Sequence, residues 1–377
     1  MKVAFTGGGT LGHIYPAISI IDYLKEKDED KTIEYLWIGR SNKREKEIIE
    51  SIDIKYYSIS CGKLRRYMSL KNFIDFFRIF IGYFQAKKIL KKETPDLLFS
   101  KGGFVSVPVV YAAKNLNIKI ITHESDITLG LATKLNSKVA NIILKGFYLN
   151  DSEKKDKRYY YCGNPIRKDL LFFKDLDIEQ YERDIIKSNN FKFRENVLPI
   201  VQKMDKTFDK KKKMILVLGG SLGALEINKL IDKNLDDLLS NYNIYHQMGE
   251  LSYRELKREN YICTKYINKE LGYLLKKADL VISRCGANAL NEEIAFKKNI
   301  LAIPLKTNSS RGEQVLNSKF YKNLNLLEVL ENSDYFIDTI RELFDNKVIE
   351  NRNKAFKEYN IINSNELIYE RIVDLIN

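Results

Sequence analysis

A short apolar strand, a glycine-rich turn and the start of a helix follow one another twice in this chain, and this repeat constrains the fold most. The first copy is the strand at 1–5, the turn TGGGTLGH at 6–13 and helical apolar spacing from 14 to about 24. The second copy is the strand at 214–218, the turn GGSLGA at 219–224 and a helix opening at Glu226. A further strand at 33–39 completes a βαβ unit with parallel strands. The repeat predicts an α/β protein with two facing Rossmann-like domains and a deep cleft between them.

Both turns have the composition of an anion site. Glycines allow positive φ and a close approach of the backbone, while the first amides and the dipole of the following helix favour negative charge. The stretch RCGANALNEE at 284–293 follows another strand, at 280–283, and has the same character. Ser221 lies in the second turn, where its hydroxyl could contact a phosphate. The second half of the chain is therefore predicted to bind a diphosphate.

The first turn also satisfies the dinucleotide pattern GxGxxG with Gly7, Gly9 and Gly12. That pattern needs an acidic residue after the second strand to hold the ribose, and this chain has Gly39 and Arg40 there. Arg40 could instead accept the 2′-phosphate of NADP, so the motif alone is weak evidence for a nicotinamide cofactor.

Polar side chains follow three strands of the first half. His13 lies at the end of the first turn, SKGGF at 100–104 follows a strand at 96–99, and HESD at 123–126 follows a strand at 118–122. Because ligands gather at the carboxyl ends of parallel strands, we expect His13, Glu124 and Asp126 to be near neighbours. A histidine beside a carboxylate can act as a general base with an orienting partner. Alternatively, His123 and Glu124 only stabilise a loop.

The composition excludes several classes of protein. Hydrophobic residues make up 44% and charged residues 30% of 377 residues, as in a globular protein. We find no signal peptide and no apolar run long enough to cross a bilayer, and we expect a cytoplasmic protein. The four cysteines are scattered without CxxC pairs, so neither a metal site nor a disulfide framework is predicted. The net charge of +13 alone identifies no partner, because the bias toward Lys, Asn and Ile could arise from an AT-rich genome.

Residues 61–92 combine basic and aromatic side chains. A basic loop CGKLRR at 61–66 precedes an apolar run with six aromatic residues between 73 and 84, and Lys87, Lys88, Lys91 and Lys92 follow. An amphipathic helix on an anionic membrane surface has this composition. A core helix with a solvated basic end has it too, since periodicity alone does not tell which face is buried.

We predict four segments. Residues 1–167 form the first domain, 168–212 a charged linker or inserted helices, 213–350 the second domain, and 351–377 a C-terminal helix packing back toward the first domain. Within the linker, Asp175 and Asp177 have the DxD spacing that holds a metal in some sugar-nucleotide enzymes, but in so polar a stretch chance explains it.

The chain resembles the GT-B glycosyltransferases, and more narrowly the bacterial N-acetylglucosaminyltransferases that complete lipid II in cell-wall synthesis. Segments that carry the resemblance occur in family order over most of residues 1–325. They are TGGGTLGHIYPA, CGKLRRYMSL, KGGFVSVPVV, HESDITLG, GNPIR, GGSLGALEIN, HQMGE, ISRCGANALNEE and SSRGEQVLNS.

This resemblance implies UDP-N-acetylglucosamine as donor, lipid I as acceptor, an inverting transfer and no cofactor or obligatory metal. It also implies roles for residues of this chain. His13 is the favoured base, Arg167 and Ser221 contact the nucleotide or its phosphates, and Glu292 binds the ribose hydroxyls. The remaining implied binding residues are Thr10, Leu11 and Gly12 in the first turn, Ile267 at the uracil, Ala287, Asn288, Ala289, Leu290 and Asn291 at the diphosphate, and Gln314 at the sugar hydroxyls.

Two positions depart from the family. Glycine is usual where Leu11 stands, and asparagine is common where Asp126 stands, so Asp126 adds a carboxylate that could orient His13 or act as the base. A UDP-sugar epimerase of the same fold and a non-catalytic membrane-bound scaffold are the competing functions. The resemblance also implies a peripheral protein on the cytoplasmic face of the cell membrane, with other cell-wall synthesis proteins as candidate partners and no nucleic-acid partner.

Overall fold

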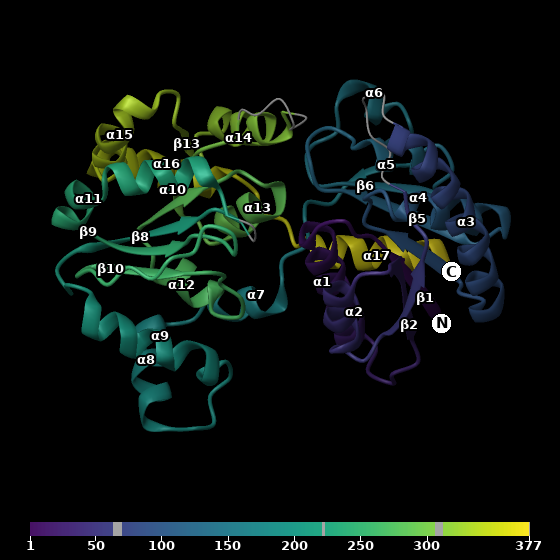
Figure 1. The fold of residues 1–377 in the computed structure, drawn as a ribbon, viewed down its shortest axis with the longest axis horizontal. Helices are drawn as coiled ribbons and strands as arrows, with labels where there is room; N and C mark the ends of the chain where they lie inside the picture. Colours follow the sequence, from purple (N-terminus) through teal and green to yellow (C-terminus); the bar gives the residue numbers. More distant parts are fainter. Residues whose placement is uncertain (63–69, 221–222, 306–311, 377) are drawn as a thin grey trace. The chain divides into compact units, whose positions relative to one another are not determined.

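The computed structural model describes residues 1–62, 70–220, 223–305 and 312–376. The chain divides into two compact units (Figure 1). Unit 1 comprises Met1–Arg167 and Ile362–Asn377, and unit 2 comprises Lys168–Ile361. The C-terminal segment therefore belongs to the same unit as the N-terminus.

Unit 1 alternates strands and helices in the order that the sequence predicts. Its strands are β1 (Lys2–Thr6), β2 (Glu34–Arg40), β3 (Lys55–Ile59), β4 (Leu97–Ser100), β5 (Lys119–Glu124), β6 (Ile142–Lys145) and β7 (Tyr159–Tyr161). Its helices are α1 (Leu11–Lys27), α2 (Lys43–Glu50), α3 (Leu70–Glu93), α4 (Ser106–Asn115), α5 (Leu131–Asn136), α6 (Asp151–Lys154) and α17 (Ser364–Ile376).

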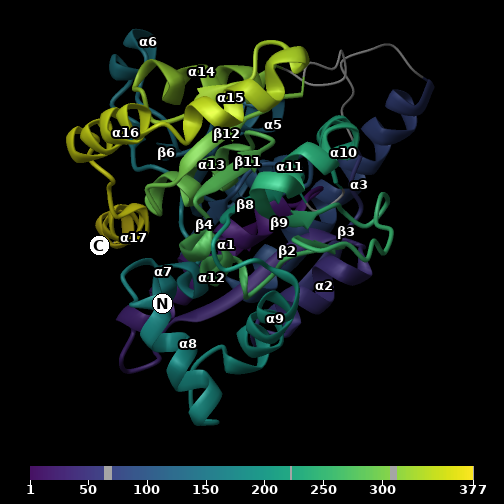
Figure 2. The same ribbon diagram turned by 90° about the vertical axis from the view of Figure 1, so that its left-hand side faces the viewer.

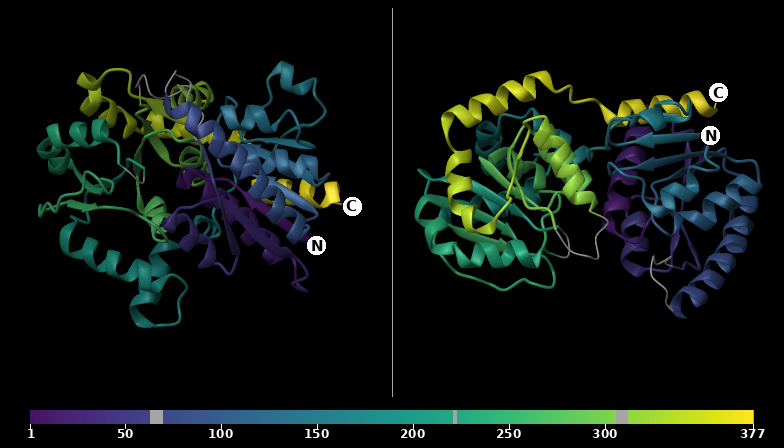
Figure 3. Two further views of the ribbon diagram at one scale, coloured as in Figure 1. Left: turned by 45° about the vertical axis from the view of Figure 1, so that its right-hand side comes forward. Right: turned by 90° about the horizontal axis from the view of Figure 1, so that it is seen from above.

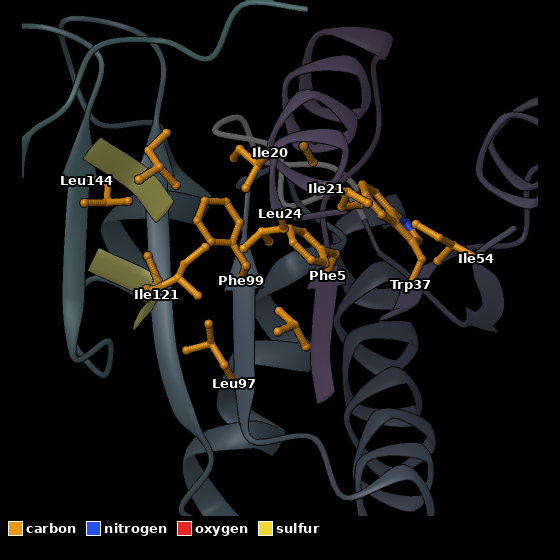
Figure 4. Close-up of a cluster of buried hydrophobic side chains, with 14 of the residues drawn as sticks. Phe5, Ile20, Ile21, Leu24, Trp37, Ile54, Leu97, Phe99, Ile121 and Leu144 are labelled. Carbon is orange, nitrogen blue, oxygen red and sulfur yellow. The ribbon is translucent and has the colours of Figure 1, made fainter. Parts of the chain in front are cut away.

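The sheet of unit 1 is parallel throughout, with the order β3-β2-β1-β4-β5-β6-β7. Alternate residues of each strand point to opposite faces, so each face needs its own cover. Phe5, Phe99 and Ile121 pack under α1, α2 and α17, while Ala4 and Leu98 pack under α3 and α4. Figure 4 shows the first of these clusters between the strands and α1. The strand order reverses between β1 and β4, which is where ligands bind in open α/β sheets.

The prediction of one helix over 351–377 is wrong. Helix α16 (Asn346–Glu358) ends in unit 2, and α17 starts after five intervening residues. The Asn363 side chain accepts a hydrogen bond from the backbone N of Glu366 at 3.3 Å, which begins a new helix by capping it. Ile368 and Ile372 are fully buried against α1, so α17 completes one face of unit 1 (Figure 3).

Unit 2 begins with three helices and continues as a second alternating sheet. Its strands are β8 (Lys213–Leu218), β9 (Tyr242–Gln247), β10 (Tyr261–Thr264), β11 (Leu280–Ser283), β12 (Asn299–Ala302) and β13 (Glu328–Val329). Its helices, besides α16, are α7 (Lys168–Lys174), α8 (Ile178–Lys187), α9 (Arg194–Thr207), α10 (Leu225–Lys233), α11 (Leu235–Asn241), α12 (Leu271–Lys277), α13 (Ala287–Ala295), α14 (Glu313–Asn323), η1 (Ser333–Tyr335) and α15 (Phe336–Leu343).

The sheet of unit 2 repeats the same plan, with parallel strands in the order β10-β9-β8-β11-β12-β13 (Figure 2). Helices α10, α11 and α15 cover one face through a cluster that includes Ile215, Ile231 and Ile340. The segment predicted as a linker or inserted helices holds α7, α8 and α9. Asp177 of its DxD pair caps α8 by accepting a hydrogen bond from the backbone N of Gln180 at 3.0 Å, which accounts for this residue without a metal.

Candidate active site

The first glycine turn of unit 1 is already occupied by a protein carboxylate. The backbone N of Gly9 donates to Oε1 of Glu45 at 3.3 Å, and the same oxygen accepts from Nε of Arg40 at 2.8 Å. Glu45 is 3% exposed. A Cβ at Gly9 would lie 2.8 Å from the Phe104 ring, so a side chain also closes the turn. The anion that this turn holds is therefore part of the protein.

This arrangement argues against a dinucleotide site. Arg40, which a 2′-phosphate would need, is ion-paired with Glu45 across the turn. Gly7 and Gly9 of the GxGxxG pattern serve the close packing of the turn, since a Cβ at Gly7 would lie 3.2 Å from the Cβ of Lys101 and one at Gly9 would meet the Phe104 ring.

His13 lies in the first turn of α1, at the carboxyl edge of the sheet. Its Nδ1 and the Thr10 Oγ1 are 2.9 Å apart, which fixes the ring orientation. Thr10 and Gly12 are exposed beside it, and Leu11 begins the helix. The His13 ring reaches the neighbouring turn, since a Cβ at Gly102 would lie 3.9 Å from its Cδ2. His13 is thus a half-buried imidazole between two glycine turns. A general base needs such a position, because a substrate hydroxyl must come within hydrogen-bond reach of it.

Glu124 and Asp126 lie at the end of β5, in the loop 124–130. The carboxylate of Glu124 accepts hydrogen bonds from the backbone N of Asp126 at 3.2 Å and of Gly130 at 2.8 Å. Both of its oxygens therefore brace the loop, and Glu124 is largely buried. Asp126 is half-buried on the same loop. The geometry gives Glu124 a loop-forming role, and its predicted catalytic role stays a prediction.

Arg167 ends unit 1 directly after the GNPI stretch. Its guanidinium lies 5.6 Å from the centre of the Tyr15 ring, a cation–π contact with α1. This contact holds a permanent positive charge beside the helix that carries His13.

The glycine turn of unit 2 differs from the first because it is open. A Cβ at Gly220 meets no atom of the described, non-adjacent residues within 4 Å, whereas a Cβ at Gly223 would lie 2.2 Å from the carbonyl O of Met248. Both residues have positive φ, of 81° and 85°. Gly223 is therefore required by packing, and Gly220 leaves space for a ligand. Ser221 lies outside the described residues.

Gln247 links this turn to Ile267. Its Nε2 donates to the carbonyl O of Gly220 at 2.8 Å, and its Oε1 accepts from the backbone N of Ile267 at 3.0 Å. Ile267 is buried, and the link fixes its backbone against the glycine turn. A nucleobase at Ile267 and a phosphate at Gly220 could then be held at a constant separation.

Helix α13 presents a second open turn. Cys285 has φ of 71°, and a Cβ at Gly286, the N-cap, meets no atom within 4 Å in the part of the chain that the structure describes. Ala287 and Leu290 face the core, which anchors the helix. Asn288, Ala289, Asn291 and Glu292 are half-buried along the other side. The N-terminus of α13 can therefore meet an anion, with Glu292 one turn further along.

Arg284 stands between the two open turns. Its NH1 donates to the carbonyl O of Gly223 at 3.4 Å, and its buried Nε has no hydrogen-bond partner among the described residues. Burial lowers the pKa of the guanidinium, which nevertheless stays charged at physiological pH. A half-buried cation between two glycine turns is suited to a diphosphate.

Gln314 lies in the first turn of α14. Its Oε1 accepts a hydrogen bond from the backbone N of Leu305 at 3.1 Å. This bond holds the Gln314 side chain against the loop that follows β12. The amide nitrogen can then donate to a sugar hydroxyl.

Three residues of these edges escaped the sequence-based site: Lys101, Gln247 and Arg284. They lie in the segments SKGGF, HQMGE and ISRCG, but the sequence alone does not show which side chains of these segments contact the neighbouring turns and loops. No group of three or more His, Cys, Asp or Glu that could hold a metal occurs in the part of the chain that the structure describes.

Known proteins match both halves of the chain. Residues 3–145 match the glycosyltransferase family 28 N-terminal domain, and residues 214–368 match the family 28 C-terminal domain. A UDP-N-acetylglucosamine--N-acetylmuramyl-(pentapeptide) pyrophosphoryl-undecaprenol N-acetylglucosamine transferase of Clostridium novyi (strain NT) is 39% identical, covering 100% of this chain and 98% of its own length.

Two solved structures share the fold. The crystal structure of Acinetobacter baumannii MurG has a TM-score of 0.68 at 19% identity, covering 100% of this chain and 98% of its own. UDP-GlcNAc 2-epimerase from Neisseria meningitidis, bound to UDP-GlcNAc, has a TM-score of 0.65 at 15% identity, covering 99% and 100%. Because enzymes of different activity share it, the fold alone leaves the reaction open.

The two family 28 domain matches, together with two parallel sheets of the same strand order, show a glycosyltransferase of the GT-B class. The full-length sequence relation is more specific than the fold. The chain belongs to glycosyltransferase family 28 and, within it, to the UDP-N-acetylglucosamine--N-acetylmuramyl-(pentapeptide) pyrophosphoryl-undecaprenol N-acetylglucosamine transferases.

Proposed function

We propose that the protein transfers N-acetylglucosamine from UDP-N-acetylglucosamine to the 4-hydroxyl of the N-acetylmuramyl unit of lipid I, with inversion, and so forms lipid II. The observation that carries the proposal is the full-length identity of 39% to a transferase named for this reaction. The two open turns of unit 2 support a diphosphate donor, and the titratable groups of unit 1 support an acceptor that must lose a proton.

We assign the donor to unit 2. Gly220, Arg284 and the N-terminus of α13 face the diphosphate, while Ile267 packs at the uracil and Glu292 accepts from the ribose hydroxyls. Charge builds on the departing diphosphate as the glycosidic bond breaks. Backbone amides and a guanidinium stabilise that charge, because they are already oriented before the reaction starts.

We assign the acceptor to unit 1. His13 takes the proton from the attacking 4-hydroxyl, and Asp126 is the second candidate for this role. General-base catalysis of this kind contributes about 10²- to 10⁴-fold to the rate. Arg167 adds positive charge for the nucleotide or its phosphates.

The test uses the whole protein with radiolabelled UDP-N-acetylglucosamine, in the presence and absence of lipid I. We expect label in a lipid product and UDP release that depends on lipid I. An epimerase would convert the donor sugar without lipid I, and a scaffold would show neither turnover nor thermal stabilisation by UDP. Either result contradicts the proposal.

We also propose that α3 binds the surface of the membrane that carries the lipid-linked acceptor. Phe77, Phe80, Ile81 and Phe84 are 51–57% exposed and lie along one side of the helix. Its opposite side, with Ala86 and Leu90, is buried against α4. Apolar area together with flanking lysines is how a peripheral helix binds anionic lipid.

Lys88, Lys91 and Lys92 are exposed at the C-terminal end of α3, and Lys87 is half-buried. The basic residues Arg65 and Arg66, predicted to take part, lie outside the described residues. No helix in the described part of the chain is long and apolar enough to cross a bilayer.

Flotation with anionic and neutral vesicles tests this surface. Phe80→Ser with Phe84→Ser should abolish flotation with anionic vesicles, and Lys87→Glu with Lys88→Glu should weaken it. Ile186→Ser on α8, where the side chain is 58% exposed, is the matched control and should float like the wild type. Unchanged flotation of both α3 variants would overturn the proposal.

A further inference from the structure

Lys101 is a buried lysine at the end of β4 that the proposed chemistry leaves without a role. It is 3% exposed, and its Nζ lies 2.6 Å from Nδ1 of His123. It also donates to Oγ of Ser125. The other ring nitrogen of His123 is 2.9 Å from the carbonyl O of Gly163, which requires that Nε2 carry the proton. Nδ1 is therefore an acceptor, and the Lys101 amine donates to it.

The loop 124–130 is held from several sides. The Asn164 Nδ2 donates to the carbonyl O of Ser125 at 3.0 Å, and the Lys145 Nζ donates to the carbonyl O of Ile127 at 3.0 Å. Lys145 is neutralised by Glu153 at 3.2 Å. Lys101 differs, because its two hydrogen-bond partners, His123 and Ser125, are neutral in charge.

Lys101 also touches the first glycine turn. The backbone N of Lys101 donates to the carbonyl O of Thr6 at 2.9 Å. A Cβ added at Gly7 would lie 3.2 Å from the Cβ of Lys101. The next residue, Gly102, adjoins the His13 ring. Lys101 thus contacts the turn that carries His13 through its backbone and Cβ, and the loop that carries Asp126 through its amine.

We propose that Lys101 is a positioning residue for the transfer, whose protonated amine holds the loop 124–130 through Ser125 and so sets the orientation of Asp126. This inference rests on the proposed function. A positioned group loses much of its effect when it is displaced by about 1 Å, so a residue that fixes the loop can change the rate without touching substrate.

The charge of Lys101 depends on pH within the working range of the protein. Burial lowers the pKa of its amine to about 8, while the negative charges of Glu124 and Asp126 oppose that shift. His123 stays neutral, since burial and the charges of Lys101 and Lys145 keep its pKa well below the usual value. The titratable groups that face the cluster are Glu124 and Asp126 on the loop, His123 on β5, Lys145 on β6, Cys162 after β7 and His13 on α1. Above about pH 8 the amine loses its proton and the loop loses a charged donor.

The experiment compares the pH dependence of the transfer to lipid I in the wild type, Lys101→Met and Lys298→Met. Lys298 is the matched control in unit 2: burial lowers its pKa to about 8 as well, and it donates to the carbonyl O of Lys276 and of Ala278. We expect wild-type turnover to fall above about pH 8. In Lys101→Met that decline should disappear, turnover at pH 7 should be about tenfold lower and the KM for the donor should not change. Lys298→Met should keep the wild-type profile.

Ser125→Ala keeps the inference testable if Lys101→Met does not fold. Ser125→Ala removes the acceptor through which the amine holds the loop, so, as in Lys101→Met, turnover at pH 7 should fall and the alkaline decline should disappear. A Lys101→Met profile that superimposes on the wild type, loss of the decline in Lys298→Met, or a wild-type profile in Ser125→Ala would each overturn the role of Lys101. Absence of transfer in the wild type would refute the proposed function instead.

Discussion

The carboxyl edges of the two sheets differ, although the sheets share one strand order around their switch points. In unit 1 the glycine turn is closed by Glu45 and Phe104, and titratable side chains gather around it. In unit 2 the turns at Gly220 and Gly286 are open, and Arg284 is the cation between them. We therefore propose that the same strand, turn and helix serve proton transfer in one unit and anion binding in the other.

Glu45 accounts for much of this difference. Its carboxylate accepts from the backbone N of Gly9, which is the place that a phosphate takes in an open turn. Because Glu45 already occupies the amide of Gly9, we propose that the donor diphosphate binds in unit 2. The turn at 6–13 is left to present His13.

The largest expected effect concerns the base in unit 1. His13→Ala should lower turnover by about 10²-fold or more with little change in the KM for the donor, because proton transfer is lost while the diphosphate site is intact. Turnover of lipid I at saturating donor measures it, and Asp126→Ala is the comparison. If His13→Ala kept near wild-type turnover while Asp126→Ala lost it, Asp126 and not His13 would be the base.

A smaller effect is expected from the cation of unit 2. Arg284→Met should raise the KM for the donor by about 10- to 100-fold, since a hydrogen bond to a charged group contributes about 1.5–3 kcal/mol. Titration with UDP followed by thermal shift checks the same loss without turnover. Arg258→Met is the control, because its guanidinium is exposed and paired with Asp236. Equal UDP binding by both variants would contradict the proposed role of Arg284 in the donor site.

The smallest effect on activity is expected at Glu293, which lies beneath the open turn of α13. Its carboxyl is 1% exposed and accepts from Oγ of Ser283 at 2.7 Å, and burial raises its pKa to about 8. Since the folded state then binds more protons than the unfolded state between about pH 4.5 and 8, stability is lost as pH rises through that range.

Glu293→Gln should remove this loss. Its melting temperature should exceed that of the wild type at pH 8.5 and approach it near pH 5, and the difference in unfolding free energy should reach a few kcal/mol. Thermal unfolding followed by circular dichroism across this range is the measurement. Glu255→Gln, at an exposed site, should show no such trend. Parallel curves for Glu293→Gln and the wild type would show that the carboxyl is ionised in the fold.

Local signals in the sequence predicted most of the architecture. The order of strands, glycine turns and helices can be predicted from short stretches of sequence. Apolar β-branched runs, glycine turns and helix starts each depend on neighbouring residues. The family motifs likewise placed His13, Asp126, Glu292 and Gln314 at the carboxyl edges. The break between α16 and α17 was missed, although Asn363 provides a local capping signal for it.

What depended on tertiary structure is the environment of each side chain. Glu45 meets Gly9 across 36 positions of the chain, Lys101 meets His123 across 22, and Arg284 meets Gly223 across 61. No local pattern records such pairs, because the sheet register brings them together. The exposure of Phe77, Phe80, Ile81 and Phe84 was undecided for the same reason, since burial depends on what packs against a helix. The residue pattern thus established two Rossmann-like domains and a sugar-nucleotide family, while packing determined which turn is open, which lysine is buried and which helix face meets solvent.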